Sequence, residues 1–522
     1  MEKKINSILI IVTSLFLALL PFFTKVVYQT NDDNIYIYML SGVFNGECSP
    51  ITIYEGFLQG LLISNLYRIG NVVEWYTLYL MLASLLAYIT ISFIVLFSKY
   101  NKMIKYVIFT ALFAIQLYFH AQPQFTIIAS ELAVASFLVY LYGEKKWHYV
   151  FSILLFALAF EMRYDATVLV FVLLSPILMV LGKLNEGKRK RTVVELLVFC
   201  IVTLLLWGID RYSIQNSKFA SYYEYNEPRN YLGCNPGYFF GKSELNDIES
   251  LELDQMYGIW VFDSKILTKD ALERCAAEVK KHWKDIIFIN FKEYFDLYFR
   301  VGLFFLLLLF IPIIFLDFRN KDWISILSVF LLLAIFIAVN IYMMSYSFPK
   351  TRNIIPVFLA MLVYGTISLT RYKEKLAIVL TLFLYSICIV LYLHKADYVA
   401  GCWNKEHLSK VEEVSDILNK VPDDKVLFSS LVPFQTEIYK SSKSEISKKI
   451  VLSDWITNSP YSIPYYTGYE SLVEGLPFLI NKDEMDYVDN IVKQIHKVYQ
   501  IQVTKEVALE SDNFYFVRIR QK

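Results

Sequence analysis

Long apolar segments dominate this chain and restrict it to a membrane environment. A hydrocarbon core of about 30 Å requires about 20 predominantly apolar residues in each spanning helix. Eleven segments approach that requirement: 5–28, 76–98, 103–120, 124–142, 147–161, 165–182, 192–209, 299–316, 323–345, 354–370 and 376–393. Hydrophobic residues make up 56% of the sequence, whereas soluble domains contain about 45–50% apolar residues. We therefore predict an all-α polytopic membrane protein with about eleven transmembrane helices.

The first apolar segment has one property of a signal peptide, since Lys3 and Lys4 precede it. It lacks a small-residue cleavage site, and it is longer than the apolar region of a signal peptide, which is about 7–15 residues. We therefore expect residues 5–28 to remain as a transmembrane helix.

Basic residues are distributed unequally over the two sides of the membrane. If the N-terminus is cytoplasmic, one side receives Lys99, Lys102, Lys105, Lys145, Lys146, Lys183, Lys188, Arg189, Lys190, Arg191, Arg319, Lys321, Arg371, Lys373 and Lys375. The short connections on the other side carry only Arg163, Lys350 and Arg352. Because cytoplasmic loops are enriched in Lys and Arg, we expect a multi-pass protein of the plasma or inner membrane. Its N-terminus should be cytoplasmic and its C-terminus extracytoplasmic.

Three longer polar stretches fall on the extracytoplasmic side in this topology. They are a first loop at 29–75, a large loop at 210–298 and a tail at 394–522. We assign residues 1–393, including both loops, to a transmembrane domain and residues 394–522 to a soluble extracytoplasmic domain. The tail alternates strand-like and helical runs, namely Val426–Ser429, Phe514–Ile519, His407–Lys420 and Asp483–Tyr499. This alternation predicts a small C-terminal α/β extracytoplasmic domain.

The charge balance and the cysteines argue against other classes of function. The chain has 50 basic and 49 acidic residues without a basic excess, so we expect no nucleic-acid partner. Its six cysteines form no CxxC pair and no Cys/His spacing typical of a metal site.

Adjacent acids after the first membrane segment are the strongest candidates for chemistry. Asp32 and Asp33 stand in the sequence Asn31-Asp32-Asp33-Asn34, at the outer membrane surface. Neighbouring carboxylates repel each other, which tends to raise one pKa. A general base requires such a poised carboxylate close to a substrate hydroxyl. The alternative is a solvated helix cap, because Asp and Asn favour N-cap positions.

Charged residues in two short outer connections and in one span are candidates for substrate binding. Arg163 and Asp165 lie in one connection, where Arg163 either binds a phosphate or pairs with the acids of its own turn. Lys350 and Arg352 open the tenth segment, where they either bind an anionic lipid phosphate or extend toward the headgroups. Glu131, inside the fourth segment, either faces a cavity or bonds to a neighbouring helix.

The first outer loop resembles that of a known superfamily. The acids open the run Asp32-Asp33-Asn34-Ile35-Tyr36, and Tyr54-Glu55-Gly56-Phe57-Leu58-Gln59-Gly60 follows further on. This order is similar to the first extracytoplasmic loop of GT-C glycosyltransferases, which include protein mannosyltransferases and lipid A aminoarabinose transferases. Arg352-Asn353-Ile354-Ile355-Pro356 resembles their Arg-Tyr-x-x-Pro pattern, with Asn353 in place of tyrosine.

The resemblance implies a membrane glycosyltransferase of cell-envelope glycan synthesis. Such enzymes take a sugar from a polyprenyl-phosphate lipid and transfer it to a glycan, lipid or protein acceptor outside the cytoplasm. Carried over to this chain, Asp32 would deprotonate the acceptor hydroxyl, and Asp33 would orient it or share that role. Arg163, Lys350 and Arg352 would hold the lipid phosphate as the leaving group.

Other functions fit some of the same features. A polysaccharide polymerase of the O-antigen or capsule type predicts catalytic arginines in the outer loops, where Arg211, Arg229 and Arg274 are scattered. A non-enzymatic transporter of lipid-linked glycans predicts inverted repeats and helices broken near the midplane, and we find no matching halves. A divalent metal is a possible cofactor, because an acid pair can hold Mg²⁺ or Mn²⁺; the sequence requires no other.

Overall fold

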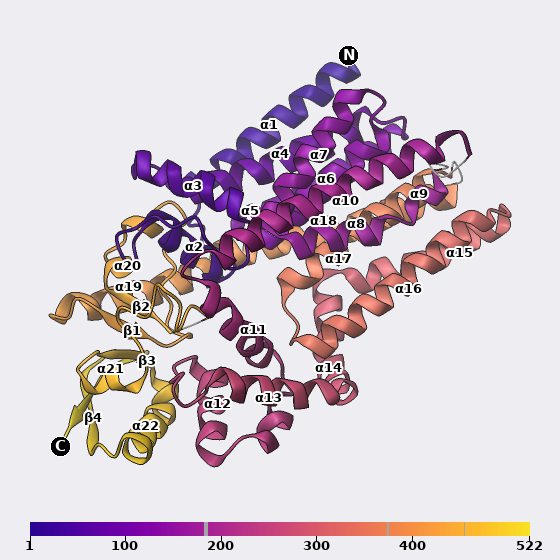
Figure 1. Cartoon of the computed structure of the whole chain (residues 1–522). Helices are drawn as coiled ribbons and strands as arrows, with labels where there is room; N and C mark the ends of the chain where they lie inside the picture. Colours follow the sequence, from indigo (N-terminus) through magenta and orange to yellow (C-terminus); the bar gives the residue numbers. More distant parts are fainter. Residues whose placement is uncertain (182–185, 373–374, 454) are drawn as a thin grey trace.

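The computed structural model describes residues 1–181, 186–372, 375–453 and 455–522. Long helices form a bundle, and the two outer loops and the tail gather at one end of it (Figure 1). We call this the capped end; it comprises residues 24–74, 216–282 and 399–522. The N-terminus lies at the opposite end of the bundle, and the C-terminus lies in the tail domain (Figure 1).

The bundle contains α1 (Glu2–Phe23), α4 (Trp75–Phe97), α5 (Lys102–Ala121), α6 (Phe125–Tyr142), α7 (Lys146–Met162), α8 (Tyr164–Leu174), α9 (Ile177–Val180), α10 (Glu186–Gln215), α14 (Trp283–Val301), α15 (Leu303–Arg319), α16 (Trp323–Tyr346), α17 (Thr351–Thr370) and α18 (Lys375–Tyr398). The two loops contain α2 (Asn31–Ser41), α3 (Phe57–Ile69), α11 (Ala220–Cys234), η1 (Tyr238–Glu244), α12 (Asp247–Ile259) and α13 (Lys269–Lys281). The tail contains η2 (Val399–Trp403), α19 (Asn404–Lys420), β1 (Val426–Phe428), η3 (Ser441–Lys443), α20 (Glu445–Lys449), β2 (Ile450–Leu452), α21 (Tyr469–Val473), β3 (Phe478–Asn481), η4 (Lys482–Glu484), α22 (Met485–Gln494), η5 (Ile495–Tyr499), β4 (Val503–Glu510) and β5 (Phe514–Gln521).

The predicted membrane segments coincide with these helices. Eight helices of the described residues are long and apolar enough to cross a membrane, and α14 with α15 makes a ninth if that bent pair is one span. The other two predicted segments are α7, with 17 residues, and the interrupted pair α8 and α9. The prediction of a polytopic all-α membrane fold is confirmed. The predicted basic residues Lys183 and Lys373 lie outside the described residues, as do the side chains of residues 186–191.

The bend between α14 and α15 measures 79° and is centred on Gly302. Gly302 has a φ of 85°, in the left-handed region that glycine enters without a steric penalty. The predicted segment 299–316 therefore begins in the last turn of α14 and continues into α15 after the bend.

The centre of the bundle is formed by α6 and α17. Of the 18-residue apolar stretch in each helix, 94% is buried in α6 and 83% in α17. Ala129, Ala133 and Ala135 give α6 small side chains, which allow neighbouring helix backbones to approach closely in a membrane. In contrast, only 17% of the corresponding apolar stretch of α1 is buried, so most of its apolar surface remains available to lipid. Figure 1 shows α1 along the edge of the bundle.

The tail folds around a five-stranded sheet of order β2-β1-β3-β5-β4. β1 is parallel to both β2 and β3, whereas β5 is antiparallel to β3 and β4. The predicted strands at Val426–Ser429 and Phe514–Ile519 correspond to β1 and β5, which lie on either side of the central strand β3. This sheet and its helices confirm the prediction of a small C-terminal α/β domain.

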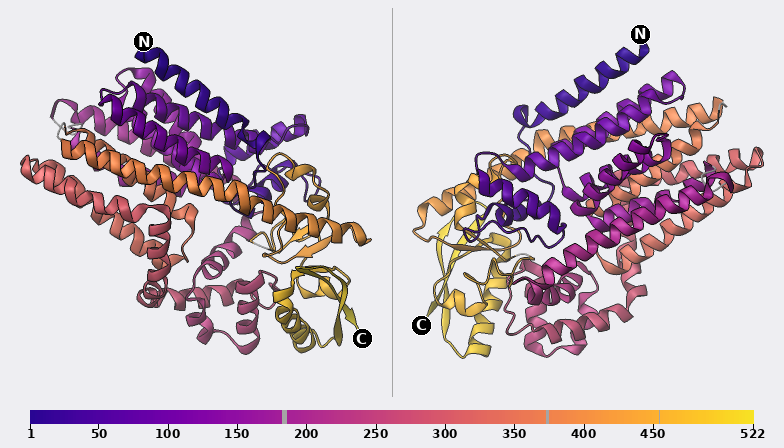
Figure 2. Two further views of the ribbon diagram at one scale, coloured as in Figure 1. Left: turned by 180° about the vertical axis from the view of Figure 1, so that it is seen from behind. Right: turned by 45° about the horizontal axis from the view of Figure 1, so that its top comes forward.

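A continuous helix connects the bundle to the tail. Residues Lys375–Lys420 form one helical stretch of 46 residues through α18, η2 and α19. Figure 2 shows it running the length of the bundle and out past the sheet. The predicted division between 1–393 and 394–522 falls inside this helix. That division into two domains stays a prediction.

The tail also contacts the first loop directly. Ile438 donates a backbone hydrogen bond to the carbonyl of Val26 at 3.0 Å. The hydroxyl of Tyr461 donates to the carbonyl of Ile51 at 3.2 Å. Because these bonds join segments about 400 residues apart, the tail and the loop around the acid pair are parts of one structure.

Candidate active site

The acid pair lies at the start of α2, a helix that follows α1 at the capped end. Thr30 is the extended N-cap residue, and Asp32 and Asp33 occupy the first turn. Carboxylates are favoured there because the helix N-terminus carries a partial positive charge. α2 ends at Ser41, and the residue that follows it, Gly42, has a φ of 80°, which is suited to glycine at a helix C-terminus. The solvated cap considered above is excluded, since Asp32 is 6% exposed and Asp33 is fully buried.

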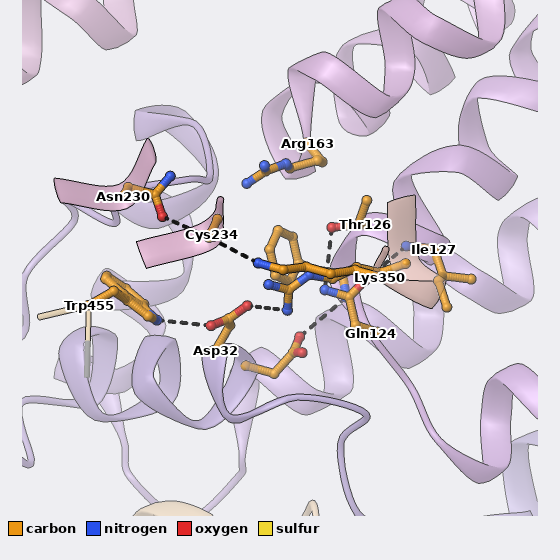
Figure 3. Close-up of polar contacts among 12 residues, drawn as sticks. Asp32, Gln124, Thr126, Ile127, Arg163, Asn230, Cys234, Lys350 and Trp455 are labelled. Atoms are coloured by element: carbon orange, nitrogen blue, oxygen red, sulfur yellow. Dashed lines mark hydrogen bonds and ion pairs between the residues drawn. The ribbon is translucent and has the colours of Figure 1, made fainter. Parts of the chain in front are cut away.

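Asp32 binds donors from two distant parts of the chain. Its Oδ2 lies 2.5 Å from Nη1 of Arg352, at the start of α17. Its Oδ1 accepts a hydrogen bond of 2.9 Å from the indole Nε1 of Trp455, in the tail. Both bonds are drawn in Figure 3, where Asp32 lies between the indole and a guanidinium. The carboxylate therefore has a fixed orientation, and each oxygen keeps a further lone pair for a substrate.

Asp33 lies in a different environment from Asp32. Its Oδ1 accepts hydrogen bonds from the hydroxyl of Tyr76 at 3.2 Å and from the backbone N–H of Phe125 at 3.3 Å. Its Oδ2 is buried and has no hydrogen-bond partner among the described residues. Burial raises the pKa of the Asp33 carboxyl well above its usual range, and the charge of Asp32 raises this pKa further. The site therefore favours the protonated form of Asp33.

Glu55 is a third buried acid, which the sequence analysis did not select. Its Oε1 accepts a hydrogen bond of 2.7 Å from the hydroxyl of Tyr76, the same hydroxyl that contacts Asp33. Burial raises the pKa of Glu55 well above its usual range, and the charge of Asp33 adds to this increase. The position of Glu55 in the Tyr-Glu-Gly run of the first loop was the only available signal.

The cations of the tenth segment lie beside the acid pair. Arg352 pairs with Asp32, as described. The Nζ of Lys350 lies 3.1 Å from the Sγ of Cys234 and 4.6 Å from the centre of the Phe348 ring. In Figure 3 the ammonium of Lys350 and the guanidinium of Arg163 extend into the same space beside Asp32. The structure therefore brings together Asp32, Asp33, Arg163, Lys350 and Arg352.

Arg163 and Asp165 form a bidentate ion pair in the turn between α7 and α8. The two hydrogen bonds measure 2.7 and 2.8 Å. The guanidinium also lies over the rings of Tyr54, at 5.2 Å, and Phe125, at 5.6 Å. The ion pair considered in the sequence analysis is therefore present. The aromatic contacts hold the guanidinium on the side of the acid pair.

Glu131 lies apart from this cluster. Its Oε2 accepts hydrogen bonds from Ser84 at 2.9 Å and from Gln116 at 3.5 Å, on α4 and α5. Gln116 also contacts the ring nitrogen of His120 at 3.1 Å. Of the two alternatives for Glu131, the contacts match hydrogen bonding to neighbouring helices.

A cleft of about 1070 Å³ lies between the bundle and the tail domain. Its bundle wall includes Thr30, Asn31, Lys350 and Arg352. Its tail wall is formed by Trp403, His407, Lys410, residues 430–435, Asn481, Lys482, Asp483, Glu484, Asp512 and Asn513. Arg352 thus borders the cleft and bonds to Asp32, which connects the cleft to the acid pair.

Several buried polar atoms around α2 have no hydrogen-bond partner among the described residues. They include both amide atoms of Asn34 and the hydroxyls of Tyr36 and Tyr38. Buried polar groups in native proteins are nearly always paired, so these atoms are candidates for contacts with a bound ligand. Within the described ranges, no group of three or more His, Cys, Asp and Glu side chains is arranged to hold a metal ion. The divalent metal stays a prediction.

Comparisons with known proteins identify the fold. No protein-family model matches the sequence, and no curated protein sequence matches it either. Among solved structures, the chain is similar to the crystal structure of ArnT from Cupriavidus metallidurans bound to undecaprenyl phosphate. The TM-score is 0.51 at 10% sequence identity, over 98% of this chain and 97% of that one. This likeness extends over the whole length and shows that the chain shares the fold of that structure.

Proposed function

We propose that this protein is a membrane glycosyltransferase that moves a sugar from a polyprenyl-phosphate-linked donor to an acceptor outside the cytoplasm. One observation carries the proposal: Asp32 of the buried acid pair bonds to Arg352, which lines a large cleft together with Lys350. The GT-C fold supports the same class, and ArnT, which has this fold, was crystallised with undecaprenyl phosphate.

In this proposal Asp32 is the general base. It accepts the proton of an acceptor hydroxyl while the hydroxyl oxygen forms a bond to the anomeric carbon of the donor sugar. The bond from that carbon to the phosphate oxygen breaks, and the phosphate leaves with the electron pair. Asp33 is assigned to orient the acceptor as a neutral carboxyl, since burial raises its pKa. A positioned base of this kind contributes about 10²–10⁴-fold to a rate.

The cations stabilise the leaving phosphate in the proposed reaction. Lys350 and Arg352 lie at the start of α17 beside the cleft, and Arg163 extends from the turn after α7 on the side of Lys350 (Figure 3). Arginine binds phosphate with two parallel hydrogen bonds, and lysine binds it as a point charge. Stabilising the charge that develops on a leaving group is usually the largest contribution to catalysis.

The cleft is assigned to the acceptor. Its tail wall offers the stacked rings of Trp403 and His407, with centroids 5.2 Å apart, and the amides of Asn481 and Asn513. Flat aromatic faces and planar polar groups suit a polyhydroxylated ligand. The capped end is proposed to face away from the cytoplasm, in accordance with the distribution of basic residues.

The proposal is tested in cells that lack the chromosomal gene and carry a plasmid copy. Mass spectrometry of the envelope glycans compares wild-type protein with the variant Asp32→Asn. We expect the wild-type copy to restore a sugar modification and the variant to leave it absent. The matched control is Asp322→Asn, because Asp322 also pairs with an arginine, Arg371, but in the connection between α15 and α16. Full modification by Asp32→Asn at normal expression would refute the proposal.

A further inference from the structure

Trp455 brings the tail domain into contact with the candidate base. Its indole N–H donates to Oδ1 of Asp32 at 2.9 Å, across 423 positions of sequence. The residue is 5% exposed, so this hydrogen bond is protected from water. The other oxygen of Asp32 binds Arg352. One donor to this carboxylate therefore comes from the bundle and another from the tail.

The ring of Trp455 also packs against both elements that carry the site. Its centroid lies 5.8 Å from the ring of Tyr36 on α2 and 5.2 Å from the ring of Tyr54 in the first loop. The ring of Tyr54 in turn lies 5.2 Å from the guanidinium of Arg163. Trp455 thus contacts the proposed base directly. The ring of Tyr54 connects it to Arg163, which is proposed to bind the phosphate.

The backbone next to this indole is fixed by α11 of the large loop. Arg229 is fully buried and donates to the carbonyl of Thr457 at 2.9 Å, and it also contacts the carbonyl of Trp455. The hydroxyl of Tyr222 donates to the same carbonyl of Trp455. Burying a guanidinium is costly unless hydrogen bonds compensate it, and here the carbonyls of Thr457 and Trp455 accept two of these bonds. The segment 455–457 is therefore held from a third part of the chain.

We propose that Trp455 is a positioning residue for the transfer reaction: its indole N–H fixes the carboxylate of Asp32, so that the tail domain completes the active site. The inference rests on the proposed function, because it concerns the base of that reaction. Charged and titratable groups that face Asp32 are Arg352 on α17 and Asp33 and Tyr36 on α2. Trp455 adds a neutral donor to this set. A neutral N–H restrains the carboxylate without competing for a phosphate.

The variant Trp455→Phe separates the hydrogen bond from the packing. Phenylalanine keeps an aromatic ring beside Tyr36 and Tyr54 but has no N–H. The matched control is Trp75→Phe, because the indole of Trp75 donates a bond of 2.7 Å to the carbonyl of Gly70, in the loop before α4. Both variants are compared in membrane vesicles from the complemented cells, which contain their own donor and acceptor. Rates are measured over a range of pH.

We expect Trp455→Phe to lower the transfer rate about tenfold, the effect of one hydrogen bond to a charged group. The acidic limb of its pH–rate profile should move upward by about one pH unit, because a hydrogen bond to a carboxylate favours the charged form. Binding of undecaprenyl phosphate to the purified protein in nanodiscs should be unchanged. Trp75→Phe should show neither effect on transfer.

The inference is overturned if Trp455→Phe has the same transfer rate and the same acidic limb of the pH–rate profile as the wild type. It is also overturned if Trp75→Phe shifts the acidic limb as much as Trp455→Phe does. The position of the limb does not depend on the amount of folded protein, so a lower yield leaves the result decisive.

The two proposals fail differently. Activity in Asp32→Asn removes the proposed function, whereas an inactive Asp32→Asn beside a fully active Trp455→Phe removes this inference alone.

Discussion

Arg352 and Asp32 form an ion pair of 2.5 Å between α17 and α2, although they are 320 positions apart in the sequence. The guanidinium proposed to hold the donor phosphate is therefore also the partner of the proposed base. Phosphate and carboxylate oxygens compete for the same N–H donors. Donor binding should draw Arg352 away from Asp32 and leave that carboxylate free to accept a proton.

This competition predicts that removing the charge of Asp32 strengthens phosphate binding. In Asp32→Asn, Arg352 no longer has to leave an ionised partner before it binds the lipid. We expect the affinity for undecaprenyl phosphate to rise roughly fivefold, the equivalent of about 1 kcal/mol for a partly exposed ion pair. The measurement is a lipid titration of the purified protein in nanodiscs, with Asp322→Asn as the control. An affinity equal to or lower than that of the wild type would show that the two groups do not compete.

Removal of the guanidinium should have the opposite effect. Arg352→Ala deletes the charge-assisted contact to phosphate, and such contacts contribute about 1.5–3 kcal/mol, so the affinity for undecaprenyl phosphate should fall by at least about tenfold. Arg371→Ala is the matched control, because Arg371 pairs with Asp322 next to the connection between α15 and α16. The same titration distinguishes the two arginines. Unchanged binding in Arg352→Ala would remove it from the phosphate site.

A third prediction about the site concerns how the first loop is held. The Oε2 of Glu161, at the end of α7, accepts backbone hydrogen bonds from Leu58 at 3.0 Å and Gln59 at 3.1 Å. Glu161 therefore caps the N-terminus of α3 from another helix. Glu161→Ala should lower stability by about 1 kcal/mol, as for loss of a helix cap, and Glu161→Gln should retain most of it because it keeps an acceptor. Thermal unfolding in nanodiscs measures both. Equal melting temperatures for Glu161→Ala and wild type would contradict the cap.

Gly56 provides an independent check of that contact. A Cβ at position 56 would lie 2.3 Å from Oε2 and 3.0 Å from Cα of Glu161. Gly56→Ala should therefore force the carboxylate off the α3 amides and destabilise the protein. Gly70→Ala is the control, because a Cβ there meets no atom within 4 Å.

The sequence contained enough information for the elements of the fold but not for the contacts between them. Apolar runs such as 124–142 predict α6 because their length matches a membrane, and the hydrophobic run at 514–519 predicts β5. These signals are local. The pair of Asp32 with Trp455 joins positions 423 residues apart, and no local pattern specifies such a partner. The same applies to Glu55, which only the shared hydroxyl of Tyr76 brings to Asp33.

Polar residues inside predicted spans illustrate the same limit. Glu131 was selected because a buried carboxyl is unfavourable in a membrane. In the structure Ser84 and Gln116 satisfy it from neighbouring helices, at a distance from the acid pair. The sequence showed that Glu131 needs partners, but only the packing of α4, α5 and α6 shows which partners it has.

The contact between the large loop and the tail should weaken as the pH rises. Glu252 on α12 is fully buried and accepts hydrogen bonds from the hydroxyl of Tyr469, at 3.0 Å, and from the N–H of Asp263. Burial raises the pKa of Glu252 from 4.5 to about 8. A raised carboxyl pKa stabilises the folded state most at low pH. This contribution decreases as the pH rises above 4.5 and is lost by about pH 8.

Glu252→Gln should remove that dependence. We expect the variant to unfold at a higher temperature than the wild type at about pH 9, and to approach the wild type at about pH 5. Asp254→Asn is the control, because Asp254 lies on the same helix but is half exposed and paired with Lys242. Thermal unfolding at the two pH values provides the comparison. A Glu252→Gln variant that is less stable than the wild type at high pH would contradict the assigned direction.

The proposed chemistry requires the capped end to face away from the cytoplasm. A polyprenyl-phosphate donor used outside the cytoplasm reaches Arg352 only if that end is extracytoplasmic, and the C-terminus lies at the same end (Figure 1). Alkaline phosphatase fused after Lys522 should therefore be active, and green fluorescent protein at the same position should be dark. The control fusion follows Tyr100, between α4 and α5, where Lys99 and Lys102 predict a cytoplasmic position. That fusion should give the reverse pattern. A fluorescent C-terminal fusion would place the acid pair on the cytoplasmic side, where an extracytoplasmic acceptor could not reach Asp32. The loops rich in Lys and Arg would then lie outside the cytoplasm, which contradicts the positive-inside rule.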